Sequence, residues 1–227
     1  MYDKTVCFTG PRPKKLLGVH GSQSEYNKII DVIYQFCEKL YLTLNCKVFI
    51  SGGAQGFDQL AFKAVNNLKQ KYPDIKNIVY IPFVGYDKQW NEYGLFTAKE
   101  FENELKNADE IKYISKSFQG VHNNGDIETA ATILNARNEA MVNDSNIVIA
   151  MYKDDSWLYE EHSGTANCMR YAKSMQKPIY QLKFNIRPNK FLTSVNMFSD
   201  LTIVRANCRQ FWSKLKNKYS NIKLTGC

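Results

Sequence analysis

The sequence alternates short apolar, β-branched runs with longer stretches whose apolar residues recur every three or four positions. Residues 4–9 form the first such run and end at Gly10-Pro11, and residues 24–45 then carry apolar side chains at helical spacing. The same unit recurs to about residue 184. This alternation predicts an α/β fold of the Rossmann-like, doubly wound kind, with a mostly parallel sheet and helices on both faces.

The predicted strands and helices can be placed from these patterns. Strands are expected at residues 4–9, 47–51, 78–81, 111–114, 147–151 and 178–184. Helices are expected at residues 24–45, between the second strand and Pro73, at residues 127–142, and from near Gly164 onward. Residues 115–126 are expected to form a long loop that could cover a ligand site beyond the carboxyl ends of the strands.

The chain is expected to form one main domain. Residues 1–184 hold the repeating units and are predicted to be a ligand-binding domain. Residues 185–227 are predicted to be a C-terminal extension packed on it, with a strand near residues 201–204 and a helix near residues 209–219.

Composition favours a compact cytoplasmic protein. Hydrophobic residues make up 44% of the 227 residues and charged residues 23%, as in ordinary globular domains. No apolar run approaches the roughly 20 residues that cross a bilayer, and the N-terminal start is too polar for a signal peptide, so no membrane partner is expected. The six cysteines lack CxxC or metal-ligand spacing, which predicts reduced thiols and no metal site. No cofactor is expected.

The net charge of +8 is compatible with an anionic partner. The lysines and arginines, however, are spread over many predicted helix faces rather than gathered in one stripe. Solvated surface charge is therefore the preferred interpretation, and a nucleic-acid partner is not expected. Attraction of a small anionic ligand fits either interpretation.

Two glycine-bearing loops each lie between a predicted strand and a predicted helix. The first is Ser51-Gly52-Gly53-Ala54-Gln55-Gly56-Phe57-Asp58, and the second is His162-Ser163-Gly164-Thr165-Ala166. Glycines let the backbone approach a ligand, and a helix start offers unpaired N–H groups to a phosphate. The plainer alternatives are a tight turn with a surface Asp58, and an ordinary helix cap by Ser163 or Thr165. Because two such loops exist, we favour a phosphate-binding role.

Three further features could complete such a site. Gly10 and Arg12 follow the first strand, where the guanidinium could pair with a phosphate. Arg137 lies on the helix stripe expected to face the core, so it needs either a structural carboxylate or an anionic ligand as partner, and the pattern does not choose between them. Pro82, Phe83 and Trp90, beyond the third strand, could stack on a base or could belong to the core.

Catalytic machinery is not legible in the sequence. The three histidines, His20, His122 and His162, show neither metal spacing nor a Ser/His/Asp arrangement, so no catalytic residue is predicted. Acidic residues around Glu160 and Glu161 lie beside His162, where a carboxylate could act as a base. A solvated acidic loop is the preferred interpretation.

Taken in order, these motifs resemble the SLOG superfamily, and in particular its YpsA-like and YoqJ-like branch. The resemblance covers about residues 4–184 and rests on the loops at Gly10 and Arg12, Ser51 to Asp58, Pro82-Phe83 with Trp90, Arg137-Asn138, and Ser163-Gly164-Thr165. It implies a Rossmann-like fold that binds nucleotide-derived ligands at the strand ends and that often assembles into homo-oligomers. Related members include the Lonely Guy phosphoribohydrolases and the DNA-processing protein DprA.

The sequence departs from the family pattern at two places. Pro11 stands where the branch usually has histidine, and Cys168 stands where the phosphoribohydrolases have a glutamate. Because that glutamate is missing, the resemblance implies a binder of a nucleotide-derived small molecule rather than an enzyme. A more specific expectation is a phage-encoded sponge that sequesters a cyclic ADP-ribose-type or cyclic-nucleotide immune signal.

Two alternatives remain open at this stage. One is a hydrolase of N-glycosidic bonds in which Glu160 or Glu161 replaces the missing glutamate. The other is a DprA-like protein that binds single-stranded nucleic acid.

Overall fold

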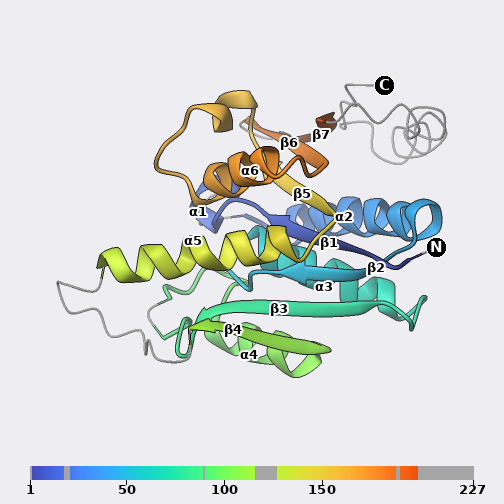
Figure 1. Cartoon of the computed structure of the whole chain (residues 1–227), viewed down its shortest axis with the longest axis horizontal. Helices are drawn as coiled ribbons and strands as arrows, with labels where there is room; N and C mark the ends of the chain where they lie inside the picture. The colour runs from blue at the N-terminus through green and yellow to red at the C-terminus, as the bar shows by residue number, and fades with distance from the viewer. Residues whose placement is uncertain (1, 18–20, 89, 116–126, 188–189, 199–227) are drawn as a thin grey trace.

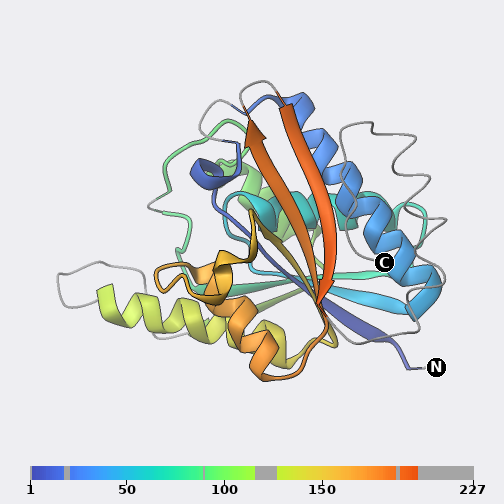
Figure 2. The same ribbon diagram turned by 90° about the horizontal axis from the view of Figure 1, so that it is seen from above.

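Seven strands form one open sheet in the order β4-β3-β2-β1-β5-β6-β7 (Figure 1). The computed structural model describes residues 2–17, 21–88, 90–115, 127–187 and 190–198. Its strands are β1 (Lys4–Thr9), β2 (Cys46–Ser51), β3 (Lys76–Phe83), β4 (Glu110–Ser115), β5 (Ile147–Tyr152), β6 (Ile179–Arg187) and β7 (Lys190–Phe198). Strands β1 to β6 pair in parallel, and β7 pairs antiparallel with β6 at one edge (Figure 2). The predicted Rossmann-like, mostly parallel α/β fold is confirmed.

Helices cover both faces of this sheet (Figures 1 and 2). They are α1 (Pro13–Leu16), α2 (Gln23–Leu44), α3 (Phe57–Lys69), α4 (Ala98–Asn107), α5 (Ile127–Asn143) and α6 (Gly164–Ser174), with a short 3-10 turn, η1, at Asp155–Leu158. Helices α2 and α3 pack on one face, where Val6 and Phe8 of β1 point. Helices α5 and α6 pack on the other face, where Cys7 points. Alternate residues of a strand therefore enter two separate apolar layers, as a doubly wound sheet requires.

Several boundaries depart from the sequence prediction. Strand β3 runs through Pro82 to Phe83, so these two residues belong to the strand rather than to a loop beyond it. Helix α4 was not predicted, because its mostly polar sequence contributes few apolar residues to the core. Strand β7 was not predicted either, and it lies before the strand expected at residues 201–204.

Some predictions fall outside the described residues. These are the strand at 201–204, the helix at 209–219 and nearly all of the loop at 115–126, of which only Ser115 is described, as the end of β4. The four cysteines in the described ranges are free and buried, in line with the predicted reduced thiols. Among the described helices, none has the length and apolar character needed to span a membrane.

Helix α4 carries a buried carboxylate whose ionisation should lower stability. Glu104 is 5% exposed, and its Oε1 has no hydrogen-bond partner among the described residues. Burial raises the pKa of Glu104 well above 4.5, opposed by the charge of Lys63 and reinforced by Glu100 and Asp58. A raised pKa in the folded state means that stability is complete at low pH and is lost as pH rises above the ordinary carboxyl range.

We therefore expect Glu104→Gln to stabilise the protein at pH 8 by about 1–3 kcal/mol and to change stability little at pH 4. Denaturant unfolding at the two pH values measures this difference. Glu102→Gln, on the exposed side of the same helix, is the control and should act equally at both pH values. A gain from Glu104→Gln that is the same at pH 4 and pH 8 would contradict the expectation.

Candidate functional site

The strand order reverses direction between β1 and β5. The chain passes from β1 outward to β2, β3 and β4 on one side, and β5 then starts the other side. At such a point the loops that follow the two neighbouring strands run apart, and ligands of doubly wound folds bind in the resulting crevice. The loops that carry Gly10, Gly52 and Gly164 all begin at this edge of the sheet.

The loop between β2 and α3 is covered by other parts of the protein. Every residue of Ser51–Gly56 is buried, including Gly52, Gly53 and Ala54. A Cβ atom on Gly52 would lie 1.4 Å from Nη1 of Arg137, and one on Gly53 would lie 2.8 Å from the ring of Phe101. The glycines leave room beside the backbone. In this structure the side chains of Arg137 in α5 and Phe101 in α4 occupy that room.

Arg137 is buried beside this loop and has a carboxylate partner. Its Nη1 donates to Oδ2 of Asp58 over 3.3 Å, and each of the two side chains is 7% exposed. Asp58 is thus not a surface residue. Of the two partners that the sequence left open for Arg137, the structural carboxylate is present, although the contact is long for a charge-assisted hydrogen bond.

Buried polar atoms without a partner gather around the same loop. Among the described residues, Nε of Arg137, Oγ of Ser51 and both side-chain polar atoms of Gln59 have no hydrogen-bond partner. Such groups are rare in folded proteins, and each calls for an explanation such as a bound molecule. Sequence reasoning missed Gln59, because a glutamine in the first turn of a helix carries no distinguishing pattern.

The charge near Asp58 is dominated by cations. Burial raises the pKa of Asp58, while the guanidinium groups of Arg137 and then Arg12 oppose that rise. Two positive charges therefore lie close to a single carboxylate. The surplus charge suits an anion.

Arg12 connects the end of β1 with the segment after β3. It is an exposed residue whose Nη2 donates to the hydroxyl of Tyr86 over 2.5 Å, and its Cζ lies 5.7 Å from the centre of the Tyr86 ring. Tyr86 in turn packs edge-on against Phe83 and Trp90. The arginine is therefore held in one place by an aromatic cluster.

The aromatic residues considered for base stacking differ in their surroundings. Pro82 and Phe83 are buried in the core, and Phe83 packs with Tyr86 and Phe101 rather than facing solvent. Trp90 is half-buried, with its ring centre 4.8 Å from that of Phe101. Of the predicted stacking residues only Trp90 keeps exposed surface.

The loop before α6 lies beside the end of β1. The Thr165 hydroxyl donates to the carbonyl of Gly10 over 2.8 Å, and Ser163 caps the helix by accepting from the N–H of Ala166. Asn138, next to Arg137 on α5, donates to the carbonyl of Gly164 over 3.3 Å. Adjacent residues of one helix thus contact both glycine-bearing loops, which the structure brings together at one edge of the sheet.

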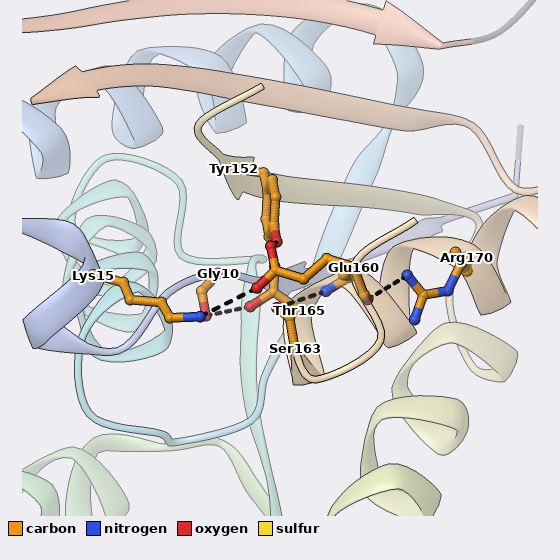
Figure 3. A network of polar contacts seen from close by, with 8 residues as sticks. Gly10, Lys15, Tyr152, Glu160, Ser163, Thr165 and Arg170 are labelled. Atoms are coloured by element: carbon orange, nitrogen blue, oxygen red, sulfur yellow. Dashed lines mark hydrogen bonds and ion pairs between the residues drawn. The ribbon is translucent and has the colours of Figure 1, made fainter. Parts of the chain in front are cut away.

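A polar network that the sequence did not reveal completes this edge (Figure 3). The hydroxyl of Tyr152, at the end of β5, donates to Oε2 of Glu160, and Lys15 of α1 donates to Oε1 over 3.3 Å. Arg170 donates to the backbone carbonyls of Trp157 and Glu160 and so anchors the loop. The sequence hints at this network only through the acidic cluster, for which a solvated loop is the preferred interpretation.

Groups with catalytic potential are few among the described residues. His162 is exposed, as is Glu161, and His20 and His122 lie outside the described ranges. Cys168 is buried in the apolar layer under α6, and burial raises the pKa of its thiol to about 11. A buried thiol with a raised pKa is largely protonated at neutral pH, unlike the carboxylate of the phosphoribohydrolases. No three His, Cys, Asp or Glu side chains within the described ranges are grouped to hold a metal ion.

Comparison with known proteins agrees with this architecture. A family model described as the YspA SLOG family (YpsA) matches residues 6–186. An uncharacterized SPbeta prophage-derived protein, YoqJ, of Bacillus subtilis is 33% identical over 64% of this chain and 81% of its own length. A UPF0398 protein of Latilactobacillus sakei is 33% identical over 39% of this chain and 47% of its own length, and UPF0398 protein BH1768 of Halalkalibacterium halodurans is 26% identical over 67% and 74%.

Proposed function

Because this chain belongs to the YspA SLOG family, we propose that it binds a nucleotide-derived small molecule at the β1/β5 edge of its sheet without turning it over. The proposed contacts are among those predicted from the sequence. They are Gly10, Arg12, Ser51, Gly52, Gly53, Ala54, Gly56, Asp58, Trp90, Arg137, Asn138, Ser163, Gly164 and Thr165. The two other residues predicted from the sequence, Pro82 and Phe83, are buried in the core and are not proposed as direct contacts.

One observation carries this proposal: a buried guanidinium with an unused donor lies on the backbone of a glycine loop. Arg137 makes one long contact to Asp58 and leaves Nε without a partner among the described residues. Guanidinium groups match phosphate oxygens through two parallel N–H donors. A phosphate of the ligand would satisfy the unused donor and would add a negative charge where two arginines face one carboxylate.

The burial of the loop Ser51–Gly56 limits how the ligand binds. Arg137 and Phe101 occupy the positions that side chains on Gly52 and Gly53 would take, so the exposed Arg12 is the first cation that a phosphate meets. Direct contact with the amides of Gly52 and Gly53 requires movement of the Arg137 side chain. Gly164 is exposed, so the start of α6 is accessible without such movement.

A more specific version of this function is the sequestration of an immune signal. YoqJ is described as prophage-derived, and a viral protein that holds a nucleotide signal intact would suppress a defence that depends on that signal. We propose this role for the present chain, with a cyclic ADP-ribose-type molecule or a cyclic nucleotide as the signal. A homo-oligomer and a cytoplasmic location remain part of the proposal.

Thermal unfolding with a panel of nucleotides, cyclic dinucleotides and ADP-ribose isomers tests the binding. A ligand at a hundred times its Kd stabilises the folded state by about 2.7 kcal/mol, which shifts Tm by several degrees. Arg137→Lys should abolish most of that shift because lysine lacks the planar pair of donors. Lys71→Gln, which removes a remote positive charge paired with Glu38, should leave the shift intact.

Chromatography of the recovered ligand separates a binder from the hydrolase alternative. After denaturation a binder returns its ligand unchanged, whereas a hydrolase returns base and sugar. No stabilisation by any member of the panel would contradict the proposed function. Release of base and sugar would replace it with the hydrolase.

A further inference from the structure

Polar groups along the β1/β5 edge form two clusters: Arg12 and Arg137 near the single carboxylate of Asp58, and Glu160 with its donors Tyr152 and Lys15. On the β2 and β3 side lie the guanidinium groups of Arg12 and Arg137, which only donate. On the α6 side lie the carboxylate of Glu160 and the carbonyl of Gly10, which only accept. A ligand with a phosphate at one end and donor groups at the other would fit this edge in a single orientation.

Helix α1 separates the two sides. Arg12, at its start, reaches toward Tyr86 in the segment after β3, whereas Lys15 reaches toward Glu160 before α6. Because α1 follows β1 directly, both contacts lie where the strand order reverses. The two clusters therefore belong to one edge, and Arg12 and Lys15, which reach toward them, are three residues apart in the sequence.

Glu160 is held in place from both its backbone and its side chain. Arg170 donates to its carbonyl over 2.8 Å, while Tyr152 and Lys15 each donate to one carboxylate oxygen (Figure 3). Figure 3 shows the carboxylate directed toward Gly10 and Thr165, at the junction of β1 and α6. The side chain is 30% exposed, so part of it is open to solvent.

We propose that Glu160 is the receptor for the ribose hydroxyl groups of the ligand. This inference rests on the proposed function, since it assigns the sugar of the same nucleotide whose phosphate binds near Arg12 and Arg137. A carboxylate accepts hydrogen bonds from vicinal hydroxyls and repels a phosphate. Glu160 thereby selects ribonucleotides with free hydroxyls and rejects deoxynucleotides and nucleotides phosphorylated on those hydroxyls. Of the two signals proposed above, this favours a cyclic ADP-ribose-type molecule with free vicinal hydroxyls over a cyclic nucleotide, whose 3′-oxygen is esterified.

The ionisation states of Glu160 and Tyr152 fit recognition of hydroxyl groups better than acid catalysis. The hydrogen bond from Tyr152 lowers the pKa of Glu160, with a smaller contribution from Lys15, so the carboxylate is charged at neutral pH. Burial raises the pKa of Tyr152, so its hydroxyl stays protonated and continues to donate. A glutamate that serves as a general acid needs its pKa raised instead.

Calorimetric titration with three nucleotides tests the assignment. The probes are ADP, 2′,3′-dideoxy-ADP and adenosine 3′,5′-bisphosphate, each titrated into the full chain. Removing a hydrogen bond to a charged acceptor costs about one power of ten or more in Kd. We expect ADP to bind at least about tenfold more tightly than the other two.

Glu160→Gln should reduce the preference for ADP over dideoxy-ADP to about threefold or less. It should also strengthen binding of the 3′-phosphorylated nucleotide, a gain that a merely structural role for Glu160 would not produce. Tyr152→Phe should weaken the preference partly, since the carboxylate loses the donor that orients it. Glu161→Gln makes the same charge change at the neighbouring exposed residue and should preserve the preference.

The failures of the two proposals are distinguishable. Equal affinities of the wild type for ADP and dideoxy-ADP would overturn the role of Glu160 and leave the proposed function in place. Absence of ADP binding together with stabilisation by another nucleotide would also overturn the role of Glu160 and leave the proposed function in place. Absence of stabilisation by every nucleotide tested would overturn both.

Discussion

Replacing Arg137 with alanine is expected to lower the free energy of unfolding by about 3–5 kcal/mol. The substitution leaves the carboxylate of Asp58, 5% exposed, without the cation whose charge most strongly opposes the rise in its pKa. It also leaves a void against Gly52, where Nη1 of Arg137 now lies. At roughly 2–4 °C per kcal/mol for a protein of this size, Tm should fall by about 10 °C.

The double variant Arg137→Ala, Asp58→Asn separates the charge from the void. It should be more stable than Arg137→Ala alone, because the isolated carboxylate is gone. Lys71→Ala, which breaks the exposed pair with Glu38, should change stability little because solvent screens such a pair. A loss from Arg137→Ala that is no larger than this control would show that the pair with Asp58 contributes nothing to the fold.

Arg137 also illustrates what the sequence could predict of the site. Its position on the inward stripe of a helix required a partner, and that requirement follows from burial alone. The identity of the partner did not follow, because Asp58 is 79 residues away in the chain and the two meet only when α5 packs over the loop after β2. Periodicity locates a side chain on a face but carries no information on which distant segment opposes it.

The strands and major helices were predictable because each has strong local periodicity. The buried runs of β1, β2 and β5 and the amphipathic α2 and α3 show it most clearly. Helix α4 was missed because only Phe101 and Glu104 of its ten residues are buried. A helix that attaches through so few side chains leaves little hydrophobic pattern.

The network around Glu160 was missed for a different reason. Tyr152 continues an apolar strand, Lys15 lies in a short basic segment, and Glu160 belongs to an acidic loop. Each residue type is ordinary where it stands, and only the reversal of strand order next to β1 brings the three together. Prediction of the site therefore requires the order of the strands as well as the sequences of the loops. The family resemblance contributes most to predicting that order.

Gly56→Ala is expected to lower the free energy of unfolding by about 3 kcal/mol or more. Gly56 has φ +99°, and an added Cβ would lie 2.5 Å from the backbone oxygen of Pro11. That oxygen also accepts the hydrogen bond from the N–H of Phe57, so the loop cannot retreat without breaking the contact between the segment after β1 and the start of α3. Backbone strain and overpacking each cost about 1–3 kcal/mol.

Gly94→Ala provides the matched control for this substitution. Gly94 also has a positive φ, +55°, but an added Cβ meets nothing within 4 Å there. Its replacement tests backbone conformation alone and should cost about 1–2 kcal/mol. If denaturant unfolding gives equal losses for the two variants, the contact between Gly56 and Pro11 does not constrain the loop. A larger loss for Gly56→Ala, accompanied by weaker nucleotide-induced stabilisation, would show that this contact holds Pro11-Arg12 in position over the proposed site.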